Sequence, residues 1–170
     1  MSSRVSDIGQ LIDRDKLIKF KFNGKEFSGL KGDTLASALL ANDQMLVGRS
    51  FKYHRPRGLV ASGVEEPNGL VGLGSDNQFE PNARMTTIEL FDGLEAFSQN
   101  HWPSLDFDLG SINNLLSKFF PAGFYYKTFI HPRAAWKYLF EPIIRKSAGL
   151  GKAPKQRDPD TYEHFYAFVD

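Results

Sequence analysis

Apolar and polar residues alternate strictly along residues 17–22, which is the pattern of a strand with one buried face. The apolar positions are Ile18, Phe20 and Phe22, and the polar positions between them are Lys19 and Lys21. Asn23-Gly24 follows and is a favoured pair for a two-residue type I′ turn. Phe27 then returns an aromatic ring to the buried face. The stretch therefore predicts a β-hairpin.

A short helix and another strand are predicted after the hairpin. Asp33 or Thr34 can cap the N–H groups of a first helical turn, and apolar residues follow at helical spacing as far as Asn42. Alternation resumes in residues 84–91, which predicts a strand that ends at the turn Asp92-Gly93.

The order of these elements is that of a β-grasp unit: strand, strand, helix, irregular loop, strand. We therefore predict an α+β fold with a β-grasp domain over residues 16–95, preceded by a flexible N-terminus at residues 1–15. Residues 49–84 would form one long loop, and a loop of that length in a compact domain is usually functional or anchored.

The second half of the chain differs in composition, because aromatic residues there lie between turns that contain Pro and Gly. Apolar spacing predicts helices near residues 111–120 and 132–148, within a helical extension over residues 96–152. We expect the aromatic faces of these helices to need cover from the β-grasp body or from a further domain. Their rings are those of Phe119, Phe120, Trp136 and Phe140. Residues 153–170 are expected to be a linker.

The ends of the two predicted helices also carry signals. Ser111 is the expected N-cap of the first helix. Pro142 should break or kink the second helix just after Phe140. Gly149 is its expected C-cap, with Leu150 folding back.

Composition excludes several classes of function. Lys and Arg number 21 against 20 Asp and Glu, so no global field attracts nucleic acid or an anionic membrane. There is no cysteine, which removes disulfides and thiolate-held metal or iron–sulfur sites. The start of the chain has no apolar signal region, and no apolar run approaches the ~20 residues that span a bilayer. A cytoplasmic protein without nucleic-acid or membrane partners is expected.

One basic cluster stands out against this neutral background. It consists of Arg49, Lys52, His54, Arg55 and Arg57. Arginine offers a planar fork to phosphate or carboxylate, so the cluster can bind an anion. On composition alone, a solvated loop or arginines tied to nearby carbonyls is the favoured interpretation. Phe51 and Tyr53 between the basic residues suggest RNA stacking, but no broader basic face supports it.

No other motif amounts to an active site. The glycines of residues 69–74 have the wrong spacing for a dinucleotide loop, and no helical pattern follows them. The four histidines are scattered, and this spacing argues against a metal site. Glu65 and Glu66 are adjacent and point opposite ways in extended chain, so they do not make an acid/base pair. We predict no catalytic residue and no metal ligand.

Several long strings nevertheless resemble one family. They are "GRSFKYHRPRG", "GVEEPN", "SQNHWPSLDFDLGSINNLL", "FFPAGFYYKTF" and "EPIIRKSAGLGKAP". They are similar to the N-terminal part of the alpha subunit of heterotetrameric sarcosine oxidases, over roughly residues 13–170. That family begins with a β-grasp domain similar to two-iron two-sulfur ferredoxins, in agreement with the element order above.

The resemblance implies a cluster loop that has lost its cluster. Related amine dehydrogenase subunits carry three cysteines after the "RPRG" segment, and Val60, Glu65 and Asn68 would stand in their places. None can replace a thiolate ligand. We expect internal contacts to clamp this loop, with Glu65 pairing with Arg55 or Arg57 and Asn68 bonding loop backbone groups.

The resemblance also implies membership of a complex that oxidises sarcosine to glycine with oxygen and tetrahydrofolate. The full complex is expected to use FAD, FMN, NAD and tetrahydrofolate and to contain beta, gamma and delta subunits. In the family a dinucleotide-binding fold follows the segment that ends here at Asp170. We therefore expect this chain to hold no cofactor itself and to be structural and subunit-contacting.

Alternatives stay open for both the chain and its basic loop. The chain could instead be an electron-transfer module of an amine or opine dehydrogenase, although the missing cysteines argue against it. An isolated anion-binding domain is a weaker alternative. Pro56 should direct Arg55 and Arg57 differently, leaving one of them, or Lys52, for a flavin phosphate or another anion.

Overall fold

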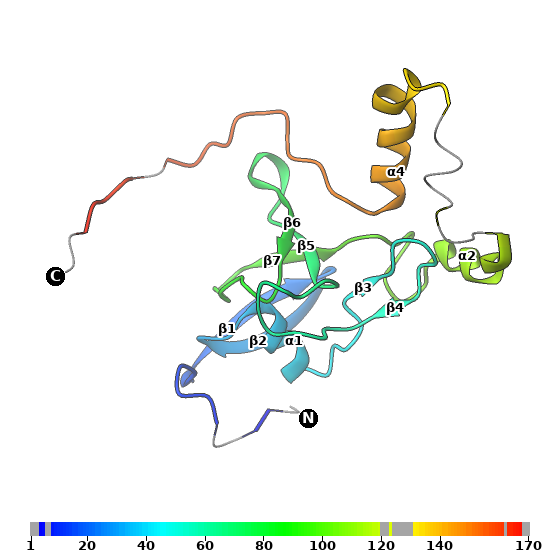
Figure 1. The fold of residues 1–170 in the computed structure, drawn as a ribbon. Helices are drawn as coiled ribbons and strands as arrows, with labels where there is room; N and C mark the ends of the chain where they lie inside the picture. Colours follow the sequence, from blue (N-terminus) through cyan, green and yellow to red (C-terminus); the bar gives the residue numbers. More distant parts are fainter. Residues whose placement is uncertain (1–3, 6–7, 120–122, 124–130, 162, 168–170) are drawn as a thin grey trace.

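The fold is described by a computed structural model covering residues 4–5, 8–119, 123, 131–161 and 163–167. Its centre is a five-stranded mixed sheet in the order β2-β1-β7-β5-β6 (Figure 1). The strands are β1 (Asp13–Phe22), β2 (Lys25–Lys31), β5 (Leu70–Leu73), β6 (Glu80–Arg84) and β7 (Glu95–Ser98). β1 and β7 run parallel and the other neighbours run antiparallel. The chain has the predicted α+β, β-grasp fold.

The hairpin between β1 and β2 confirms its prediction. Asn23 and Gly24 both have positive φ angles, 50° and 76°, which is what a type I′ turn requires. Phe20 lies opposite Phe27 across the hairpin, and their rings stack with centroids 5.7 Å apart.

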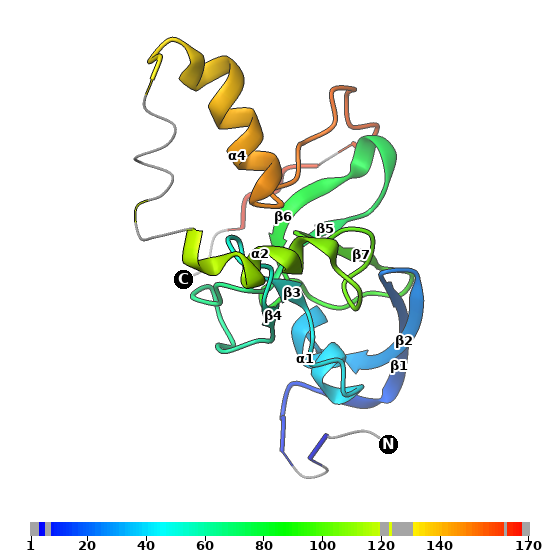
Figure 2. The same cartoon turned by 90° about the vertical axis from the view of Figure 1, so that its right-hand side faces the viewer.

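Helix α1 (Leu35–Ala41) packs on the sheet beside this hairpin, as Figure 2 shows. Thr34 and Ser37 form a reciprocal capping box at its start, so Thr34 is the N-cap. The buried core joins apolar side chains of α1 to those of the sheet and of the segments around it. Its largest members are Phe20, Phe22, Leu35, Leu39, Met85 and Leu94.

The strand predicted at residues 84–91 is wrong for most of that length. β6 ends at Arg84, and Glu89 makes only an isolated bridge with Thr34. The reason is that this segment binds the start of α1 instead of another strand. The carbonyls of Ile88 and Met85 accept the N–H groups of Leu35 and Ala36, which a helix leaves without intrahelical partners. The predicted long loop contains β5 and β6, which complete the sheet.

A second, two-stranded ribbon pairs β3 (Gly48–Arg49) with β4 (Pro56–Arg57), and it carries the basic cluster. A 3₁₀ turn, η1 (Asp76–Gln78), joins β5 to β6.

The first predicted helix of the extension is three short pieces, η2 (Leu109–Ser111), α2 (Ile112–Leu115) and η3 (Ser117–Phe119). Ser111 makes no capping bond there, which corrects the prediction. Asp108 caps this region instead, because its carboxylate accepts the Gly110 N–H. The ring of Phe120 lies outside the described residues.

The second helix starts as a π-helix, η4 (Trp136–Phe140), and continues as α4 (Glu141–Ser147). The change of helix type falls where Pro142 was expected to disturb it. Gly149 (φ 68°) ends α4, and the Leu150 N–H returns to the Arg145 carbonyl, as a Schellman motif requires. Gly151 N–H then donates to Asn82 Oδ1 (3.0 Å), which ties the end of α4 to β6.

Candidate functional site

The basic cluster sits at the tip and base of the β3–β4 ribbon. The Ser50 N–H donates to the Arg55 carbonyl and the His54 N–H donates to the Ser50 carbonyl, so the chain turns back within four residues. His54 has a φ of 52°, a left-handed conformation that is uncommon for residues other than glycine. The turn fixes the direction in which each basic side chain leaves the ribbon.

Arg55 faces the extension. Its guanidinium lies 4.9 Å from the ring centroid of Tyr53, and its Nε donates to Asn114 Oδ1 of α2 at 2.7 Å. Lys52 lies over the same ring at 5.0 Å. Arg55 therefore holds α2 beside the ribbon and does not pair with Glu65, which corrects that expectation.

Arg49 and His54 hold the segment that leads into the extension. Arg49 Nε and Nη2 donate to the Leu105 carbonyl, at 2.9 and 2.6 Å. His54 Nδ1 lies 2.6 Å from Asp108 Oδ2. Asp108 is buried and also accepts the N–H groups of Trp102 and Gly110. Burial alone would raise the pKa of Asp108, but these bonds outweigh it and lower that pKa.

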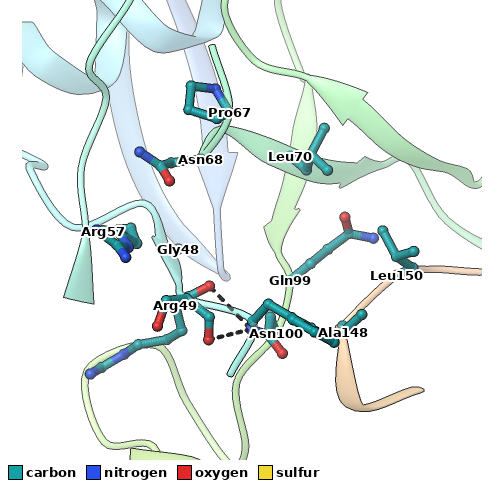
Figure 3. Close-up of a pocket in the computed structure, with 13 residues that line it drawn as sticks. Gly48, Arg49, Arg57, Pro67, Asn68, Leu70, Gln99, Asn100, Ala148 and Leu150 are labelled. Atoms are coloured by element: carbon teal, nitrogen blue, oxygen red, sulfur yellow. Dashed lines mark hydrogen bonds between the residues drawn. The ribbon is translucent and has the colours of Figure 1, made fainter. Parts of the chain in front are cut away.

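Arg57 lines a cavity of about 370 Å³ (Figure 3), and Arg55 is not among the residues that line it. In the described part of the chain the Arg57 guanidinium has no hydrogen bond or ion pair. The cavity walls also include the amide side chains of Asn68, Gln99 and Asn100. Figure 3 shows Arg57 and Gln99 on opposite sides of this space. Gln99 Oε1 is buried and has no hydrogen-bond partner among the described residues.

The two arginines separated by Pro56 therefore line different cavities, as the predicted split requires, but Arg55 faces Asn114 and not Glu65 or the loop carbonyls. Arg55 lines a separate cavity of about 530 Å³ beside α2, together with His54 and Ile112. The cavity at Arg57 contains no acidic side chain among the residues that line it. It can accept a small anion with an apolar part, because Pro67, Leu70 and Leu150 supply apolar surface.

The loop over residues 58–68 closes on Glu66. The Glu66 side chain is fully buried. Its Oε2 accepts the N–H groups of Val60 and Ala61, and its Oε1 accepts the N–H of Asn68, each at 2.7 Å. Burial opposes ionisation, yet these three donors lower the pKa of Glu66 below its ordinary value. The carboxylate is therefore charged and enclosed at neutral pH.

Three further side chains tie the loop down. Arg84 Nη1 donates to the Val64 carbonyl and, at 2.6 Å, to the Glu66 carbonyl. Thr86 Oγ1 donates to the Gly63 carbonyl at 2.8 Å. Asn68 Nδ2 donates to the Gly58 carbonyl at 3.0 Å, which confirms the expected role of Asn68.

Glu65 is the acidic residue that the sequence singled out, and the structure corrects this choice. Its Oε1 accepts the N–H of Gly63 at 3.1 Å on the exposed side of the loop. No ion pair joins it to Arg55 or Arg57 among the described residues. Sequence reasoning missed Glu66, Arg84 and Asp108. The one available signal was that adjacent residues in an extended chain point in opposite directions, so one of Glu65 and Glu66 had to face the inside of the loop.

Comparison with known proteins shows which family of domains this loop belongs to. A family model described as "2Fe-2S iron-sulfur cluster binding domain" matches residues 15–101. The chain is 59% identical to the sarcosine oxidase subunit alpha of Rhizobium meliloti (strain 1021) over 94% of its length. The chain belongs to the family of 2Fe-2S iron-sulfur cluster binding domains, and it is homologous over nearly its whole length to this sarcosine oxidase subunit.

Other similar proteins share less of the chain. The sarcosine oxidase subunit alpha of Corynebacterium sp. (strain U-96) is 40% identical over 55% of the chain. The chain spans 16% and 10% of the lengths of these two relatives. An L-proline dehydrogenase from P. horikoshii is similar in structure, with a TM-score of 0.40, 25% identity, and coverage of 54% of this chain and 17% of that one.

The residues present do not fit an iron–sulfur cluster. The chain has no cysteine, and the ferredoxin-type clusters that the family model names are held by thiolates. Inside the loop, the backbone N–H groups of Val60, Ala61 and Asn68 bond the buried Glu66 carboxylate instead. Among the described residues, no group of His, Asp and Glu side chains is arranged to hold a metal ion, and no helix there is long and apolar enough to cross a membrane.

Proposed function

We propose that this chain is the N-terminal region of a sarcosine oxidase alpha subunit and serves there as a structural, subunit-contacting module without catalytic residues. The observation that carries the proposal is the loop of residues 58–68. It belongs to a cluster-binding fold, yet it lacks thiolates and is closed internally by Glu66. An electron-transfer role would need a redox group that these residues cannot hold.

The proposed complex is a cytoplasmic oxidoreductase that oxidises sarcosine, a CH–NH donor, to glycine with oxygen and tetrahydrofolate. FAD, FMN, NAD and tetrahydrofolate would be bound elsewhere, by the beta, gamma and delta subunits and the remainder of the alpha chain. Within this chain we assign residues 1–15 to a flexible N-terminus, 16–95 to the β-grasp domain and 96–152 to the helical extension. Residues 153–170 would lead to a dinucleotide-binding domain.

The extension supports a contact role because it leaves large apolar side chains uncovered. Phe119 is 75% exposed and Trp136 is 50% exposed, and neither belongs to the buried core. Leu115, Tyr138 and Leu139 are exposed on the same extension. A contiguous apolar patch marks an interaction site, and we propose that these side chains form one in the assembled subunit.

The basic residues supply a second contact. Arg57, with Lys52 and Arg55 nearby, is proposed to meet an anionic group at the subunit boundary, either a flavin phosphate or a carboxylate of a partner. The support is the cavity around Arg57, which contains a cation and amide groups but no acidic lining residue.

Assembly of the full-length alpha subunit with its partners tests the structural role. We expect the double variant Phe119→Ser/Trp136→Ser to co-purify with less beta subunit. Phe165→Ser/Tyr166→Ser is the matched control, because these rings are also exposed but lie in the proposed linker. Peroxide formed from sarcosine per assembled complex should be unchanged in both. Normal assembly with a reduced rate per complex would contradict the proposal, as would iron in this segment.

A further inference from the structure

We infer that the Glu66 carboxylate is the anion around which the loop of residues 58–68 folds, in the place where related domains enclose an iron–sulfur cluster. This goes beyond a subunit-contact role, because it assigns a function to one side chain whether or not the complex assembles as proposed. The first support is geometric. Three backbone N–H groups converge on one buried carboxylate, two on Oε2 and one on Oε1.

Convergent N–H groups of this kind mark an anion site. A run of backbone N–H groups that point into a loop forms a concave site for anions, and clusters in proteins likewise accept hydrogen bonds at their sulfurs. Here the donors belong to Val60, Ala61 and Asn68, which lie on both sides of the loop. The anion that they enclose is supplied from the same loop, by residue 66.

The charge of this anion is balanced locally. Arg84 lies on the strand beside the loop and bonds the carbonyls of Val64 and Glu66. Its positive charge also lowers the pKa of Glu66, behind the larger effect of the three N–H donors. Among the described residues, no lysine, histidine or other arginine side chain bonds this carboxylate. The groups that face it are the backbone N–H donors and the charge of Arg84.

The fit of the loop around this side chain leaves little space for another group. A Cβ at Gly69 would lie 3.3 Å from Glu66 Cγ and closer still to Met85 and Leu59. The Asn68 side chain joins the two ends of the loop, because its Nδ2 donates to the Gly58 carbonyl. Removing the Glu66 carboxylate would therefore leave a small polar cavity that holds three unpaired donors.

Chemical rescue provides the test. In Glu66→Ala, the vacated site is the size of a small carboxylate, so sodium acetate should bind where sodium chloride at equal ionic strength should not. Hydrogen exchange followed by mass spectrometry reports on loop residues 58–69 in the full-length chain. We expect at least a tenfold loss of protection there in Glu66→Ala, and recovery of most of it in acetate. Glu65→Ala is the matched control, and its protection should change less than twofold in either salt.

Each outcome decides the inference. Loss of protection without recovery in acetate would mean that Glu66 acts through packing, and unchanged protection would mean that it does not order the loop. Both results overturn the inference. If Glu66→Ala does not fold, Glu66→Gln decides instead. Gln keeps the volume of the side chain, but its amide N–H₂ would face one of the backbone N–H donors. The loop amides should therefore lose protection from exchange, while the amides of the sheet should keep theirs. Protection equal to the wild-type loop would overturn the inference.

Discussion

Nδ1 of His54 lies 2.6 Å from Oδ2 of Asp108, and this contact joins the turn of the basic ribbon to the start of the extension. The two residues are 54 positions apart in the sequence. Gly110 is needed beside them, because a Cβ there would collide with the imidazole ring of His54. The extension is therefore attached to the β-grasp body by a specific polar contact and not only by apolar packing.

Replacing Asp108 with Asn should destabilise the chain. The carboxylate accepts bonds from His54 and from the N–H groups of Trp102 and Gly110, and the amide of Asn can accept only part of this set. A hydrogen bond to a charged group contributes about 1.5–3 kcal/mol, so we expect a loss of that order in the free energy of unfolding. Urea denaturation measures it. Asp106→Asn is the control, since that side chain is 69% exposed and should change stability by less than about 0.5 kcal/mol. Equal effects would contradict this account.

Acid should destabilise the fold through its buried carboxylates. The pKa values of Asp33, Glu66 and Asp108 are all lowered in the folded chain, in each case because hydrogen bonds outweigh burial. A lowered folded pKa stabilises the fold above the ordinary carboxyl range, and this stability is lost as the pH falls through that range toward the folded pKa. We expect urea midpoints to fall steeply from pH 5 to pH 3.

The same titration in Glu66→Gln isolates one of these groups. The variant should start from a lower midpoint at pH 5 and should lose less between pH 5 and pH 3, because one of the three carboxylates no longer takes up a proton. A slope identical to that of the wild type would show that Glu66 has no lowered pKa.

Gly149→Ala should weaken the contacts that hold the C-terminal end of α4 against the β-grasp domain. Gly149 has a φ of 68°, and a Cβ there would collide with the backbone of Asn100. Gly93→Ala is the matched control, since Gly93 also has positive φ (80°) but open space around it. Both changes should cost about 1–2 kcal/mol from backbone strain. Gly149→Ala should cost more than Gly93→Ala because of the collision, and only Gly149→Ala should also speed tryptic cleavage at Arg145 and Lys146. Similar cleavage of both variants would mean that Asn100 does not anchor this helix end.

The elements that the sequence predicts well are those whose signals are local. The hairpin turn at Asn23-Gly24 and the Thr34 cap depend on neighbouring residues, and both are present. The strand expected at residues 84–91 failed because its backbone bonds to the start of α1, a partner that alternation cannot reveal. Glu65 and Glu66 are chemically identical, so only the path of the loop decides which of them is enclosed. The Asp108 contact is likewise invisible without the fold.

Arg55 and Arg57 should respond differently to alanine replacement. Arg55 bonds Asn114 and stacks on Tyr53 within this chain, so Arg55→Ala should lower the melting temperature of the chain by a few degrees. Arg57 has no such bond among the described residues and lines the cavity that faces Gln99. Arg57→Ala should therefore leave the melting temperature unchanged.

The effect of Arg57→Ala should appear only in the assembled complex. A charge-assisted hydrogen bond to an anionic group contributes about 1.5–3 kcal/mol, or roughly a tenfold to hundredfold change in affinity. If the anion is a flavin phosphate, flavin content per complex should fall; if it is a partner's carboxylate, subunit dissociation should become faster at unchanged flavin content. Arg57→Lys should recover part of either effect, because it keeps the charge without the planar fork. Unchanged flavin content and unchanged dissociation in Arg57→Ala would show that the guanidinium meets only solvent, and that the cavity is not a contact site.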